Sequence, residues 1–137
     1  MRMIANILWV IFGGWLTALG WLLAALLMAI TIIGLPWTRA CLSIARFSVW
    51  PFGSRLVPRD QLKGRPTLGN SPLGLIGNVI WFILGGWYLA IMHLFVGAVW
   101  CITIIGIPFG TAQFRLMKQA FAPIGKAVVP MDVARRL

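Results

Sequence analysis

Few side chains in this 137-residue chain have the chemistry to handle a proton or an ion, and most of them lie in apolar surroundings. His93 is the only histidine, and a histidine within a membrane segment can sense a proton or pack through a hydrogen bond. Asn6 and Asn78 each begin an apolar run. Their amides are suited either to hydrogen bonding between helices or to lining a polar path.

A repeated phrase offers a second kind of site. TIIGLP at residues 31–36 returns as TIIGIP at residues 103–108. Proline donates no backbone hydrogen bond and glycine loosens the helix, so nearby carbonyls lose partners. Two interpretations stay open: a helix stop at the membrane boundary, or carbonyls and hydroxyls that coordinate an ion or polar solute. The residues concerned are Thr31, Gly34 and Pro36, with Thr103, Gly106 and Pro108 in the second copy.

Other chemistry is missing from the sequence. The apolar runs hold no Asp or Glu, which a proton-driven cation antiporter generally needs within the membrane. We find no catalytic triad, paired acids or metal-ligand cluster, and Cys41 and Cys101 are interpreted as small packing residues. We therefore expect no enzymatic activity, no cofactor and no metal.

Composition indicates where these residues reside. The chain is 61% hydrophobic and only 10% charged, and no Asp, Glu, Lys or Arg occurs from Met3 to Thr38 or from Pro66 to Phe114. Uncharged apolar runs well beyond about 20 residues are long enough to cross a bilayer as helix. The sequence predicts an all-α integral membrane protein.

The chain also aligns with itself after a shift of 72 residues. NILWVIFGGW at 6–15 falls on NVIWFILGGW at 78–87, and the two acidic residues, Asp60 and Asp132, fall on each other. Matches at Asn, Trp, Gly and Asp in one register indicate internal duplication. We predict a membrane module at residues 1–60, a polar linker at 61–72 and a second module at 73–137.

Each predicted module joins an apolar membrane segment to an amphipathic helix between two prolines, at 36–51 and 108–123. The polar stripe of this helix is basic, as expected for a helix at the lipid headgroup level. Short extended pieces are expected at RLVP and AVVP in the polar tails. The candidate headgroup contacts are Arg39 and Arg46 in the first copy and Arg115 and Lys118 in the second.

The number of crossings is open. If each module crosses once, the twelve basic residues divide six against six and give no orientation signal. If each module enters and leaves on one side, all twelve face the cytoplasm, and we favour this arrangement. The net charge of +10 then indicates contact with anionic lipid headgroups and not with nucleic acid.

Tryptophans are expected to divide by position along the apolar runs. Trp residues near the ends of a run favour the membrane interface. Those predicted at the interface are Trp9, Trp37, Trp50, Trp81 and Trp100, and those predicted to pack between helices are Trp15, Trp21 and Trp87.

The phrases NILWVIFGGW, LPWTRACLSIARFSVWPFG and CITIIGIPFGTAQFRLMKQAFAPIG give the chain a resemblance to the YccF family of small bacterial inner-membrane proteins. The resemblance covers nearly the whole chain and implies a multi-pass protein of the bacterial inner (cytoplasmic) membrane. It implies no residue-specific chemistry. We expect a homo-oligomeric channel or transporter for a small ion. The alternative is a non-catalytic accessory protein that binds and regulates another membrane protein.

Overall fold

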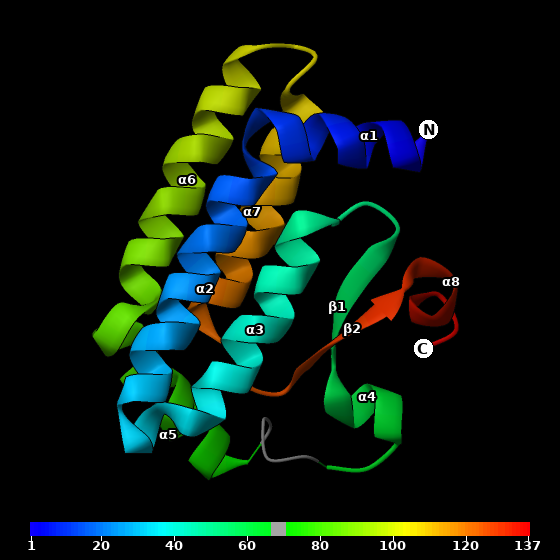
Figure 1. Cartoon of the computed structure of the whole chain (residues 1–137). Coiled ribbons are helices and arrows are strands. Elements are labelled where there is room, and N and C mark those ends of the chain that lie inside the picture. Colours follow the sequence, from blue (N-terminus) through cyan, green and yellow to red (C-terminus); the bar gives the residue numbers. More distant parts are fainter. Residues whose placement is uncertain (67–70) are drawn as a thin grey trace.

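The structure, a computed structural model, describes residues 1–66 and 71–137. Part of the linker predicted at 61–72 therefore lies outside the described residues. The two halves of the chain follow the same order of elements (Figure 1). The first half contains α1 (Arg2–Trp9), α2 (Trp15–Ile30), α3 (Leu35–Val49), β1 (Ser54–Pro58) and α4 (Arg59–Lys63). The second contains α5 (Pro72–Trp81), α6 (Trp87–Ile102), α7 (Ile107–Phe121), β2 (Lys126–Pro130) and α8 (Met131–Ala134).

A double glycine breaks each long apolar segment. Between α1 and α2 the chain forms a π-helical turn, Val10–Gly14, in which Gly13 has a φ of 136°. Figure 1 shows α1 lying across the end of α2 instead of continuing it. At 1.5 Å per residue the 16 residues of α2 extend about 24 Å, less than the roughly 30 Å of a hydrocarbon core. By length and composition alone, Arg2–Ile30 and Pro72–Ile102 are candidate membrane spans.

The repeated phrase forms the turn of a helical hairpin in each module. Thr31 leaves the helix with an extended backbone, and Gly34 N–H donates to Thr31 O at 3.0 Å. A Cβ on Gly34 would lie 2.5 Å from Met28 O, and one on Gly106 would overlap Trp100 O. Only glycine allows the chain to turn this tightly. Consequently α3 returns beside α2, and α7 returns beside α6.

An approximate two-fold axis relates the modules. Strands β1 and β2 pair antiparallel with Leu56 opposite Val128, two residues that are 72 positions apart, as in the sequence repeat. Trp21 and His93 are also 72 apart and contact each other. Because equivalent positions meet at both places, the axis passes between them. The hairpin turns accordingly lie at opposite ends of the molecule, while the predicted extended pieces form the sheet (Figure 1).

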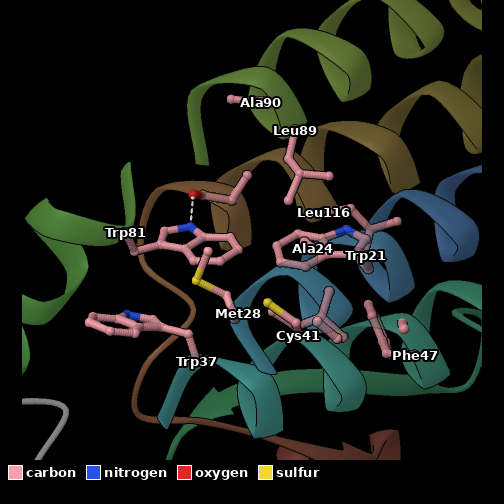
Figure 2. Packing of buried hydrophobic residues seen from close by; sticks show 14 of the residues in the cluster. Trp21, Ala24, Met28, Trp37, Cys41, Phe47, Trp81, Leu89, Ala90 and Leu116 are labelled. Atoms are coloured by element: carbon pink, nitrogen blue, oxygen red, sulfur yellow. Dashed lines mark hydrogen bonds between the residues drawn. The ribbon is translucent and has the colours of Figure 1, made fainter. Parts of the chain in front are cut away.

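The core lies between the two hairpins. Figure 2 shows Trp81, Trp21, Leu89 and Leu116 packed together, with the small side chains of α2 and α3 beside them. The Trp21 and Trp81 rings stack with centroids 6.1 Å apart. Aromatic stacking of this kind adds to the free energy gained by burying the rings.

The predicted division of tryptophans is partly wrong. Trp9, Trp37 and Trp81, expected at the interface, are buried, whereas Trp15 and Trp87, expected to pack, are half exposed. The reason is that the buried indoles find carbonyl partners inside the fold. Trp9 Nε1–H donates to Ser48 O at 2.6 Å, and Trp81 Nε1–H donates to Ala120 O at 2.7 Å, so neither ring needs the interface for its polar end.

Candidate functional site

A buried polar junction joins the modules at the two-fold axis. Trp21 Nε1–H donates to His93 Nε2 at 2.9 Å, and His93 Nδ1 lies 2.6 Å from Gln113 Oε1. All three side chains are fully buried. An indole nitrogen can only donate, so His93 Nε2 must be the acceptor. We therefore assign the proton to Nδ1, which donates to Gln113, and the imidazole is neutral in this arrangement.

Gln113 gives this junction its one unused polar group. Its Nε2 is buried and has no hydrogen-bond partner in the described part of the chain. A buried donor without an acceptor costs about 1–3 kcal/mol. In the repeat, Cys41 stands where the second module has Gln113, and Trp21 stands where it has His93. The polar junction thus departs from the two-fold symmetry around it, and this is why the repeat alone does not predict it.

The two asparagines hold the ends of α3 and α7 against the first helix of each module. Asn6 Nδ2–H donates to Phe52 O at 2.7 Å, and Phe52 N–H donates to Asn6 Oδ1 at 2.9 Å. In the second module, Ile124 N–H donates to Asn78 Oδ1 at 3.2 Å. The structure therefore places both amides in packing contacts inside their own modules, whereas His93 bonds to Trp21 and Gln113.

The threonines of the repeated phrase bond to their own helices. Thr31 Oγ1–H donates to Met28 O at 2.9 Å, and Thr103 Oγ1–H donates to Trp100 O at 3.0 Å. Pro36 and Pro108 occupy the first turns of α3 and α7. Because the two turns lie at opposite ends of the fold, the structure does not bring these residues to one centre or next to His93 (Figure 1).

Three of the four candidate headgroup residues line cavities beside the sheet. Arg39, Arg46, Arg115 and Lys118 are exposed. Arg46 lines a cavity of about 460 Å³ between α3 and the strands. Arg115 and Lys118 line a second cavity of about 150 Å³ between α3, α7 and β1.

Sequence reasoning missed two further residues of this face. Arg59 lines the first cavity, and Arg55 lines the second. Both fall in the segment that was interpreted as a solvated tail. The usable signal was the extended piece RLVP, because a strand paired with its own repeat places Arg55 and Arg59 beside the amphipathic helices.

This fold defines a class of protein: helical membrane proteins made of two copies of one module that are joined about a two-fold axis. The chain belongs to the YccF family, because it matches that family's inner membrane component domain over residues 4–54 and 76–126. The two matches are offset by the same 72 residues as the internal repeat.

Two relatives have the same description, inner membrane protein YccF: one from Escherichia coli (strain K12) and one from Shigella flexneri. Each is 41% identical over 137 residues, covering 98% of this chain and 92% of the relative. No solved structure matches the chain. Family and relatives together identify an inner-membrane protein.

Proposed function

We propose that the chain is a non-catalytic accessory component of the inner membrane, inserted from the cytoplasmic side as two hairpins that lie along the membrane plane. The pairing of β1 with β2 supports the one-sided insertion most directly. One strand follows the first hairpin and the other follows the second, so a shared sheet requires the chain to leave both hairpins on the same side of the bilayer. If each module crossed the bilayer once, the two strands would be on opposite sides.

The distribution of charge fits the same placement. The helices α2 and α6 contain no Lys or Arg, and they expose large apolar side chains such as Leu23, Leu26 and Phe95. The basic residues lie outside these two helices, on α3, α7 and α4, in the strands, in the linker and near the chain ends. Figure 1 shows α6 on one side of the bundle and β1, β2 and α8 on the other. A layer of α2 and α6 in the hydrocarbon, with the basic face in the cytoplasm, satisfies the positive-inside rule.

A multi-pass arrangement is the competing placement, and the two candidate spans favour it by length and composition. In that orientation the two-fold axis would lie in the membrane plane. Strand β1 and its Arg55 would then flank the bundle at the level of the hydrocarbon core. Exposed strand edges and arginine are both unfavourable there. One-sided insertion avoids this cost.

Cysteine accessibility separates the two placements. Lys63→Cys and Arg136→Cys are expected to react with a membrane-impermeant maleimide in inside-out vesicles and not in intact spheroplasts. Ile32→Cys, at an exposed apolar hairpin turn, is expected to react in neither. The unsubstituted chain, with its buried Cys41 and partly buried Cys101, sets the background. Labelling of positions 63 and 136 from opposite sides would establish single crossings.

Transport by a homo-oligomer is the second candidate, favoured by the unpaired Gln113 amide at the junction of the modules. Polar groups between inverted modules form the substrate sites of many transporters. Against it, Gln113 is fully buried, and neither of the two cavities described above includes it in its lining. A path would therefore have to form between copies of the chain.

Liposomes that contain only the purified protein test this candidate. We expect chloride, potassium and proton gradients to decay no faster than in empty liposomes, because hairpins inserted from one side do not cross the bilayer. Flux that Gln113→Leu abolishes, and that Asn78→Leu leaves unchanged, would instead assign transport to the junction.

A further inference from the structure

Two cavities with basic walls lie where the helices meet the sheet. The larger, about 460 Å³, includes Arg46 of α3 and Arg59 of α4 in its lining. The smaller, about 150 Å³, is lined by Arg55, Arg115 and Lys118. None of the residues found to line either cavity is acidic. Five positive side chains therefore surround two hollows without a carboxylate to neutralise them.

The two cavities correspond to each other under the internal repeat. Arg46 of the first occupies the position of Lys118 in the second, and Ser43 occupies the position of Arg115. Strand residues at the sheet centre, Val128 and Leu56, line the first and the second respectively. The larger cavity gains Arg59 from α4, and the smaller gains Arg55 from β1. Each cavity thus combines the return helix of one module with the strand of the other module.

We infer that each cavity holds the phosphate of an anionic phospholipid headgroup, one lipid for each cavity. Guanidinium and ammonium groups bind phosphate through charge-assisted hydrogen bonds. The surroundings select a lipid over a free anion. Trp50 lines the larger cavity and is 45% exposed, and Phe121, one turn beyond Lys118, is 46% exposed. A ligand with a phosphate for the cavity and an apolar tail for these rings satisfies both.

The inference rests on the one-sided insertion proposed above, which brings α3 and α7 to the headgroup level. There the acyl chains continue toward the apolar faces of α2 and α6. Phosphatidylglycerol has the required single negative phosphodiester and serves as the probe. Phosphatidylcholine, which is zwitterionic and has no net charge, serves as the control.

Native mass spectrometry of the full chain, relipidated in detergent with phosphatidylglycerol, counts the retained lipids. We expect two per chain for the unsubstituted protein and none with phosphatidylcholine. The variant Arg46→Gln/Lys118→Gln removes one positive charge from each cavity and should retain fewer lipids, since each basic residue removed near a lipid headgroup weakens binding about fivefold. The control Arg135→Gln/Arg136→Gln removes the same charge outside both cavities and should keep both lipids.

Three results would overturn the inference: equal retention by the cavity variant, equal loss by the control, or displacement of the lipid by inorganic phosphate at matched ionic strength. If the cavity variant does not fold, Arg55→Gln/Arg59→Gln removes charge from the exposed strand side and carries the same expectation. Cysteine accessibility measured on the cavity variant should still be one-sided, so loss of the lipids alone is distinguished from failure of the proposed insertion.

Discussion

Replacing Gly86 with alanine is expected to destabilise the protein by about 3 kcal/mol, because overpacking and a broken buried hydrogen bond act together. A Cβ at this position would lie 2.5 Å from Ala120 O and 2.6 Å from Trp81 Nε1. These two atoms form the hydrogen bond that joins α5 to the end of α7. Both of them are fixed by the surrounding core, so the new methyl group has no room unless that bond opens.

The neighbouring glycine supplies a matched control. At Gly85 the nearest atom to an added Cβ is Tyr88 Cε1, a side-chain atom, at 3.3 Å. Gly85→Ala is therefore expected to change the free energy of unfolding by no more than about 1 kcal/mol, since alanine also favours helix. Denaturant unfolding of both variants in detergent micelles measures the difference. Equal stabilities would show that the Trp81 bond does not hold α5 against the end of α7.

His93→Leu is expected to cost about 3 kcal/mol, because it leaves both Trp21 Nε1–H and Gln113 Oε1 buried without partners. Leucine fills much of the same space, so the loss is mainly of hydrogen bonds and not of packing. The same unfolding measurement in micelles applies.

A double-mutant cycle with Gln113→Leu isolates the contact between the two side chains. Gln113→Leu alone removes the unpaired amide but leaves His93 Nδ1–H without an acceptor. The double variant His93→Leu/Gln113→Leu also removes Gln113 Oε1, which His93→Leu alone leaves without a partner. Its loss of stability should therefore be smaller than the sum of the two single losses by at least about 1 kcal/mol. Strict additivity would mean that the bond between His93 and Gln113 contributes nothing to folding.

The sequence predicted the elements of this fold better than their meeting points. Duplication, the paired helices and the strands at RLVP and AVVP all follow from local residue patterns. The contact of Trp21 with His93 does not, although the repeat had already aligned the two positions. Alignment shows that positions are equivalent, and only the direction of the two-fold axis decides whether equivalent positions touch.

The tryptophans show the same limit in another way. Nearness to the end of an apolar run predicted Trp9 and Trp81 at the membrane interface, where the polar end of an indole would find water. Each instead bonds to a carbonyl near the end of the hairpin's return helix. That carbonyl is 39 residues away in the sequence, and no local sequence pattern predicts the contact.

The pairing of Leu56 with Val128 also bears on how such a chain arises. A strand that pairs about its own repeat would pair equally well with a second copy of a single module, so the fold is that of a homodimer joined into one polypeptide. In such a dimer a residue on the axis always faces itself, and two tryptophans there would offer two donors and no acceptor. Fusion removes that identity. It lets one half supply the indole N–H of Trp21 and the other half the imidazole of His93 that accepts it.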